Sequence, residues 1–124
     1  MTYKIDFDTS TQVISVIYSG PTDLDSKLRA VEEVTQTYGG KNGMKILIDV
    51  RNETMNMLLS EQESFGEYLA NHHDLHEAKV AVLHEPGFNP NTVIDFISHK
   101  NGYQLVEFVS LADATQWLIQ SKVA

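Results

Sequence analysis

The sequence predicts a single α/β domain covering residues 1–124, with the element order ββαβαβαβα and a mixed, mostly parallel five-stranded sheet packed with four helices. Three observations predict this class. The length of 124 residues suits one domain with an ordinary core. The chain begins with two alternating apolar and polar runs that are typical of a β-hairpin. Short apolar runs then alternate with segments of helical periodicity, which requires parallel strands joined by right-handed crossovers.

The opening hairpin is predicted from Tyr3–Phe7 and Val13–Tyr18, which alternate apolar and polar residues on either side of the turn-forming Asp8–Thr11. Gly20-Pro21 is expected to end the second strand. Thr22 is then expected to cap the first helix, because threonine is a common N-cap residue.

The first helix is predicted from apolar residues that recur at helical spacing and form one buried stripe. They are Leu24, Leu28, Val31, Val34 and Tyr38. The glycine-rich segment 39–43 is expected to stop this helix and to form a turn before the next strand.

The stretch Lys45–Ser60 is the segment around which the rest of the chain is organised. A strand from about Met44 to Val50, buried on both faces, is expected to run into a polar and Met-rich loop. Ser60 and Glu63 have the spacing of a capping box, so a second helix is expected to begin at Ser60 and to end near residues 73–76. Its inner face is predicted to contain Phe65, Leu69 and either His72 or Leu75.

The second half of the chain continues the alternation. A buried strand is predicted at Lys79–His84, and Asn89-Pro90 is expected to begin a third helix that Asn101-Gly102 ends. The last strand is predicted at Leu105–Val109, and Ser110 is expected to begin the last helix. The inner faces of these two helices are predicted to contain Val93, Ile94, Ile97, Ala114, Trp117 and Leu118.

Composition excludes several classes of function. The chain has 17 acidic against 9 basic residues, a formal charge of −8, and no cluster of Lys or Arg, so nucleic-acid binding is not expected. It has no cysteine, and its start lacks the basic and apolar regions of a signal peptide. No apolar run approaches the roughly 20 residues that span a bilayer. We therefore expect a cytoplasmic protein without an integral membrane segment.

The order of elements resembles the SpoIIAA-like fold of STAS domains and anti-sigma-factor antagonists, and more closely the uncharacterised bacterial SpoIIAA-like proteins. The similarity is in the strands Lys45–Val50 and Lys79–Leu83 and in the ending Val106–Phe108, Ala112–Ala114 and Trp117-Leu118. The resemblance implies a regulatory or ligand-sensing module without established chemistry.

The same resemblance implies a phosphorylatable serine in an Asp-Ser-Ser-Gly-like run at the start of the helix after the third strand. This chain has the longer and more apolar Arg51–Leu59 before Ser60 at that place. That difference argues against a phosphoserine switch.

Candidate binding residues are predicted where the third and fourth strands end. Asp49, Arg51 and Asn52 follow one strand, and His84 and Glu85 follow the next. The carboxyl ends of parallel strands meet at one rim of a sheet, so these side chains could form a polar pocket for a small ligand or an anion. Alternatively, Asp49 and Arg51 form a structural pair that holds loop backbone.

The loop before the second helix contains the large apolar residues Met55, Met57, Leu58 and Leu59. Met-rich apolar surfaces adapt to variable partners, so this loop is either a surface for a protein partner, a second copy or an apolar ligand, or a lid over the sheet. Both interpretations stay open. Ser60 is a further candidate, although its expected role as a cap already explains it.

A metal site and a catalytic site have little support in the sequence. His72 and His76 have i, i+4 spacing, but no acidic third ligand is placed as in His-Glu-x-x-His. No Gly-x-Ser-x-Gly elbow is present. We therefore hypothesise a non-catalytic regulatory or protein-interaction module that needs no cofactor. The alternatives are a binder of a small apolar or lipid-like ligand and, third, an enzyme that uses His84 with Asp49 or Glu85.

Overall fold

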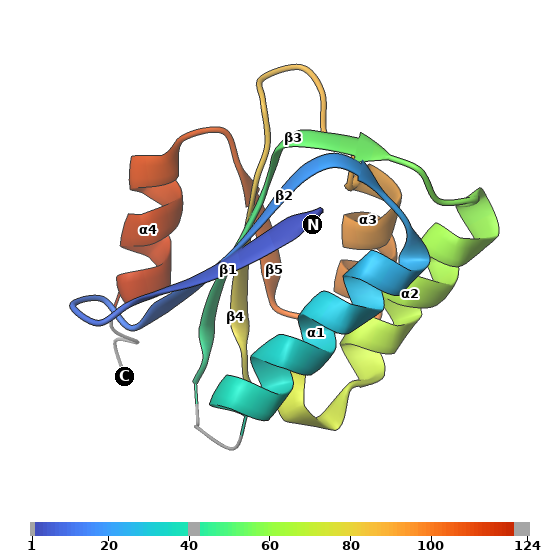
Figure 1. The fold of residues 1–124 in the computed structure, drawn as a ribbon. Helices are drawn as coiled ribbons and strands as arrows, with labels where there is room; N and C mark the ends of the chain where they lie inside the picture. Colours follow the sequence, from blue (N-terminus) through green and yellow to red (C-terminus); the bar gives the residue numbers. More distant parts are fainter. Residues whose placement is uncertain (1, 40–42, 121–124) are drawn as a thin grey trace.

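The computed structural model describes residues 2–39 and 43–120, and it contains a five-stranded sheet in the order β1-β2-β3-β4-β5 (Figure 1). The strands are β1 (Tyr3–Asp8), β2 (Val13–Thr22), β3 (Lys45–Met55), β4 (Lys79–Leu83) and β5 (Leu105–Phe108). The first two strands are antiparallel, and each later strand is parallel to its predecessor. Within the described residues, the predicted mixed and mostly parallel five-stranded sheet is confirmed.

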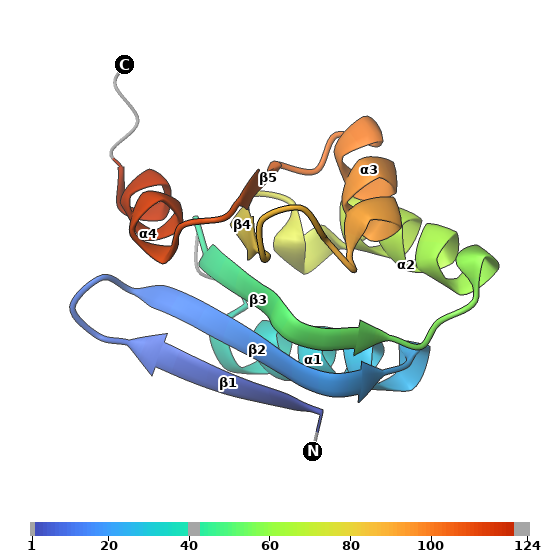
Figure 2. The same cartoon turned by 90° about the horizontal axis from the view of Figure 1, so that it is seen from above.

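Helices cover both faces of the sheet. They are α1 (Leu24–Tyr38), α2 (Leu59–Asn71), α3 (Thr92–Lys100) and α4 (Leu111–Ile119), with a short 3-10 helix, η1 (His73–Leu75), after α2. Figures 1 and 2 show α4 on one face, with α1, α2 and α3 on the other. None of the helices in residues 2–39 and 43–120 has both the length and the apolar character needed to cross a membrane.

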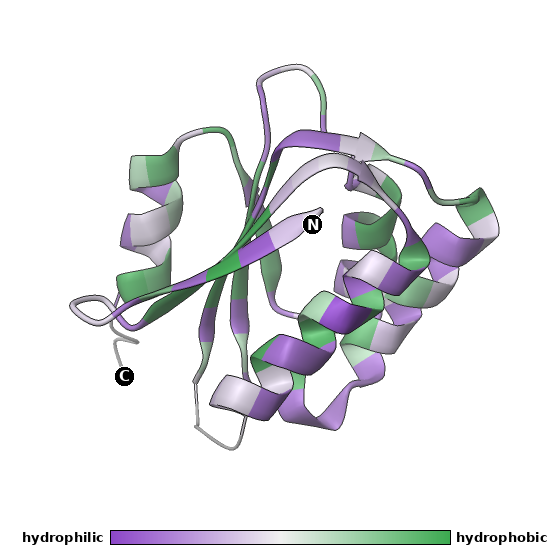
Figure 3. Ribbon diagram, viewed as in Figure 1, coloured by the Kyte–Doolittle hydropathy of each residue, from purple (hydrophilic) through white to green (hydrophobic). Residues whose placement is uncertain are grey.

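The core has a part on each face of the sheet. On the α1 side, Val16, Ile46 and Val80 belong to one large buried cluster, whereas Leu47 and Leu118 pack together on the α4 side. Figure 3 shows apolar residues concentrated along the central strands and on the inner sides of the helices. The alternation of Ile46 and Leu47 between the two faces follows from the two-residue period of a strand.

Two strands run several residues beyond their predicted ends, whereas the other strand boundaries differ from the prediction by at most one residue. β2 runs through Gly20-Pro21 to Thr22, and β3 runs on to Met55, so residues 51–55 are strand and not loop. Beyond Tyr18, β2 no longer pairs with β1 and pairs only with β3. Proline lacks an N–H, and it is tolerated here because that side of the strand is an edge. Residues 40–42 of the predicted glycine-rich turn lie outside the described residues.

Three predicted helix starts are wrong by one or two residues. The cap of α1 is Asp23, whose side chain accepts a hydrogen bond from the Ser26 N–H at 2.9 Å, because Thr22 still belongs to β2. The predicted Ser60 cap is also wrong: α2 begins after Leu58, whose N–H donates to the Glu61 carboxylate at 2.8 Å. The chain offers acids at both 61 and 63, and the structure uses the earlier one.

The start of α3 differs in the same way. Its N-cap is Asn91, so the predicted cap Asn89 and Pro90 precede the helix. Asn89 nevertheless supports this start, because its backbone carbonyl accepts hydrogen bonds from both the N–H and the hydroxyl of Thr92. The prediction for α4 is confirmed, since the Ser110 hydroxyl accepts from the Asp113 N–H at 3.2 Å.

Candidate functional site

A β-bulge in β3 determines which side chains reach the α1 side of the sheet. Between the register pairs Ile17–Asp49 and Ser19–Asn52, β3 advances by one residue more than β2. The extra residue shifts the alternation, so that Glu53 lies opposite Gly20. Without the bulge, Glu53 would face α4. With it, the Glu53 carboxylate is directed to the face that α1 covers.

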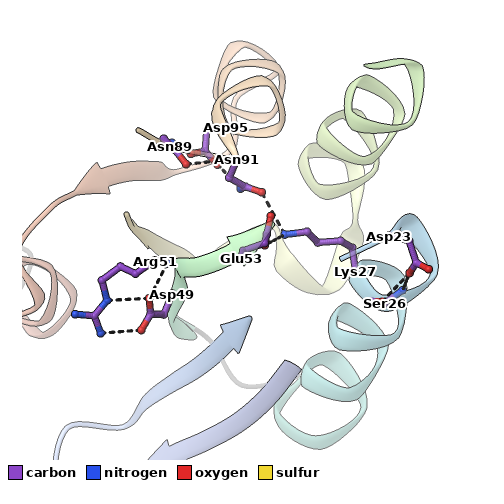
Figure 4. Close-up of polar contacts among 9 residues, drawn as sticks. All are labelled: Asp23, Ser26, Lys27, Asp49, Arg51, Glu53, Asn89, Asn91 and Asp95. Carbon is purple, nitrogen blue, oxygen red and sulfur yellow. Dashed lines mark hydrogen bonds and ion pairs between the residues drawn. The ribbon is translucent and has the colours of Figure 1, made fainter. Parts of the chain in front are cut away.

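Lys27 of α1 meets that carboxylate inside the protein. Lys27 is only 1 % exposed, and its Nζ lies 2.5 Å from Glu53 Oε1 (Figure 4). The same ammonium donates to Asn91 Oδ1 at 3.3 Å and lies 3.8 Å from the centre of the Tyr18 ring. The buried ion pair therefore joins α1, β2, β3 and the residue that caps α3.

The polar network extends from Asn91 toward the surface. Its amide donates to Asp95 Oδ1 at 2.6 Å, while the Asn89 amide donates to Asp95 Oδ2 at 2.9 Å and to Glu107 Oε2 at 2.6 Å. Burial, followed by the contact with Glu107, raises the pKa of Asp95 to about 8. The Asp95 carboxyl therefore has a proton available near neutral pH.

Burial and the ion pair with Glu53 shift the pKa of Lys27 in opposite directions. Burial lowers the pKa of Lys27, because water no longer stabilises the ammonium, and the Glu53 carboxylate opposes that change. Burial also raises the pKa of Tyr18, and Glu53 adds to the effect. The two charges compensate one another inside an otherwise apolar layer.

Two buried polar atoms on this face of the sheet lack a hydrogen-bond partner within the described residues. They are Glu53 Oε2 and Thr22 Oγ1. Thr22 is 0 % exposed and the Glu53 side chain is 0 % exposed, so bulk water does not reach either atom. Leaving a buried polar atom unpaired costs on the order of 1–3 kcal/mol. The site therefore has unused capacity for hydrogen bonding.

An interior cavity of about 50 Å³ lies between the sheet and the helices α1 and α2. Lys27 and Asn91 are in its wall, and aliphatic and aromatic side chains supply the rest, including Phe65 and Leu69 of α2. The full wall consists of Val16, Tyr18, Lys27, Ala30, Val31, Val34, Ile46, Ile48, Phe65, Leu69, Leu75, Val80, Val82, Asn91, Tyr103 and Leu105. The cavity is thus apolar with one polar end.

The residues predicted at the strand ends occupy a different place. Arg51 and Asp49 form a two-pronged ion pair, with Nε–Oδ1 and Nη2–Oδ2 distances of 3.0 and 2.9 Å (Figure 4). Asp49 also accepts the Arg51 backbone N–H at 3.1 Å, so this pair holds strand backbone. Asn52 is exposed. His84 Nδ1 lies 2.8 Å from the carbonyl oxygen of the exposed Glu85.

The apolar segment before α2 is divided between core and surface. Met57 is 8 % exposed and packs with Phe65 and Ile94, and Met55 is half-buried against the same cluster. Leu58 and Leu59 are 70 % and 61 % exposed. Neither methionine lines the interior cavity. The following Ser60 is exposed inside the first turn of α2.

Sequence reasoning missed the buried polar network. For Lys27 a signal existed, because it lies four residues before Val31 and seven before Val34, in the buried stripe of α1. A charge at such a position indicates a buried partner. For Glu53 the sequence contains no such signal, because the direction of its side chain depends on the bulge.

No protein-family model matches this chain, and no curated protein matches it. Among solved structures, it is similar to the crystal structure of an uncharacterised protein of the DUF3478 family with a SpoIIAA-like fold from Shewanella loihica PV-4. The two chains are 15 % identical, and the match has a TM-score of 0.64 and covers 94 % of this chain and 91 % of the other. This chain therefore has the SpoIIAA-like fold that its element order predicts.

Proposed function

We propose that this chain is a non-catalytic binding module of the STAS type that contacts a protein partner through the first turn of α2. The supporting observation is the exposure of Leu58 and Leu59, 70 % and 61 %, immediately after the buried Met57. Met57 holds the backbone here, so the two leucines are presented by an anchored turn. Apolar side chains held at the surface in this way favour contact with another apolar surface.

The chemistry of the neighbouring residues fits a binding role without turnover. The Asp49–Arg51 pair is satisfied by its own ion pair, and His84 contacts the carbonyl of the next residue. These contacts support structural roles for the polar residues at the strand ends. We therefore assign recognition to Leu58 and Leu59 at the start of α2.

A variant with Leu58→Ser and Leu59→Ser tests the proposal. The matched control is Val109→Ser with Leu111→Ser, because these residues are 55 % and 48 % exposed near the other helical layer. Sedimentation velocity over a range of concentrations measures self-association, and native mass spectrometry of the protein from its own cells measures bound proteins. We expect the α2 variant to lose association that the control retains. Equal association of wild type and both variants would refute the role of α2.

The interior cavity supports a second candidate function, the binding of a small apolar ligand. Phe65 and Leu69 of α2 line this cavity, and α2 is also the helix that carries the exposed leucines. A ligand that fills the cavity would therefore touch the element proposed to contact the partner. Organic extraction of the natively purified protein, followed by mass spectrometry, tests for a retained apolar molecule. We expect to find an apolar molecule in stoichiometric amount. If no such molecule is found and the addition of short apolar probes leaves the melting temperature unchanged, the second candidate function is refuted.

A further inference from the structure

A surface groove of about 420 Å³ lies between α3 and β5. One wall is a stripe of α3, in which Thr92, Phe96 and His99 follow one another at helical spacing. The other wall is β5 at Val106 and Glu107. Phe96 is 65 % exposed, so the groove contains apolar surface that nothing in the described residues covers.

β5 borders this groove with the open edge of the sheet (Figure 2). Within the described residues, β5 pairs only with β4. The carbonyls of Gln104 and Phe108 accept hydrogen bonds from backbone N–H groups on the β4 side, each at 3.0 Å. The backbone polar groups of successive strand residues alternate between the two edges, so the N–H and the carbonyl of Glu107 face away from β4. A further strand could pair with these groups.

The opposite edge of the sheet is less suited to such pairing. There β1 carries Lys4 and Asp6, whose charged side chains are 72 % and 53 % exposed and lie 3.6 Å apart. Charged side chains on an edge strand discourage the addition of another strand. β5 has a single charged residue, Glu107, and faces Phe96 across the groove.

The charges of the groove indicate which kind of strand would fit. The carboxyl groups of Asp95 and Glu107 lie together, because the Asn89 amide donates to both, at 2.9 and 2.6 Å. Among the described residues, no Lys or Arg lines the groove. Glu107 is exposed, so its carboxylate can meet a cationic side chain, and opposite charges on neighbouring strands attract.

We propose that the groove binds an extended segment of a partner protein as an added strand on β5, with an apolar side chain against Phe96 and a lysine or arginine side chain against Glu107. Both side chains would point to the α3 side, so one residue separates them in the segment. Neither Leu58 nor Leu59 lines this groove. The surface is therefore a second one, independent of the proposed contact through α2.

Titration of the isotope-labelled full chain with acetylated and amidated hexapeptides tests the inference. The parent peptide is Thr-Val-Thr-Lys-Thr-Val, and the charge-reversed peptide is Thr-Val-Thr-Glu-Thr-Val. We expect the parent to shift the amide signals of Phe96 and Glu107 saturably and to slow hydrogen exchange at the Glu107 amide. The charge-reversed peptide should bind at least about threefold more weakly, because a like charge replaces an opposite one. Equal affinity for the two peptides would overturn the assignment of a basic partner.

Two N-methylated forms of the parent peptide distinguish strand addition from contact through side chains alone. One is methylated on its odd residues and the other on its even residues. Because the N–H groups of a strand alternate between its two edges, one form should bind like the parent and the other at least about tenfold more weakly. If both forms bind as tightly as the parent, strand addition is overturned.

Phe96→Ser should remove binding of the parent peptide, and Phe88→Ser is the matched control. Phe88 is 67 % exposed but does not line the groove, so its replacement should leave peptide binding unchanged. Absence of binding by the wild type would overturn the proposal. Self-association that Phe96→Ser abolishes and Phe88→Ser retains would also overturn it, because a second copy of this chain would then occupy the groove.

Discussion

Removing one partner of the Lys27–Glu53 pair should destabilise the protein far more than removing both. The Lys27→Met substitution leaves the Glu53 carboxylate, whose side chain is 0 % exposed, without its 2.5 Å partner. Breaking a buried pair in this way costs about 3–5 kcal/mol. The loss of the cationic contact with the Tyr18 ring adds up to about 2 kcal/mol, because that contact is shielded from water.

The Glu53→Leu substitution should cost a similar amount, because it leaves a buried ammonium without an anion. The double variant Lys27→Met with Glu53→Leu should have a free energy of unfolding within about 1–2 kcal/mol of the wild type, or above it, since no charge remains in the apolar layer. Urea denaturation at pH 7 measures all four proteins. The two single substitutions are thus expected to be strongly non-additive.

The pH dependence of the Lys27→Met variant provides an independent check. An isolated buried carboxylate has a raised pKa in the folded protein, so the folded state holds its proton more tightly than the unfolded state. The destabilisation should therefore be smallest below the ordinary pKa of glutamate, about 4.3, and should grow as the pH rises. Additive losses in the two single variants, with no dependence on pH, would refute the reasoning about the pair.

Three further predictions follow from the packing. Met57→Ser should lower the free energy of unfolding by about 2–4 kcal/mol because Met57 is core, whereas Leu58→Ser should change it by no more than about 0.5 kcal/mol. Chemical denaturation measures both variants, and equal losses would contradict the division of this segment between core and surface. Gly66→Ala should destabilise by about 1–3 kcal/mol, because a Cβ there would lie 2.8 Å from the Cβ of Ile97; an unchanged melting temperature would show that α2 and α3 separate freely. The buried Asp95, with its pKa raised to about 8, should make stability fall as the pH rises from about 4 to about 8, and Asp95→Asn should flatten that dependence in denaturation experiments; identical profiles would exclude this group as the cause.

The fold could be predicted because its signals are local. Periodicity alone specifies several elements: the alternation at Tyr3–Phe7, the buried stripe from Leu24 to Tyr38 and the apolar run at Lys79–His84. Helix starts were less accurate. Asn89 competes with Asn91, which is an equally good cap, whereas the cap of α2 is Leu58, a residue type that rarely caps a helix. The choice between such neighbours depends on where the preceding strand ends, which is set by pairing with another strand.

The extension of β2 and β3 illustrates that limit. Gly20-Pro21 is a chain-breaking signal, and here it lies inside a strand because β1 begins opposite Tyr18, so the edge of β2 beyond Ser19 does not pair with β1. The residues after Val50 were expected in a loop because that stretch is polar and Met-rich. In the structure they continue β3, so Glu53 is fixed by strand pairing.

The residues of the buried polar network come from three separate chain segments. Lys27 is in α1, Glu53 is in β3, and Asn91 precedes α3, so no local pattern connects them. The bulge in β3 is what directs Glu53 to the helix that carries Lys27. An ion pair buried at this position costs desolvation that an apolar pair would avoid. The pair nevertheless fixes the positions of α1, β3 and the start of α3 relative to one another, because the hydrogen bonds of Lys27 join all three.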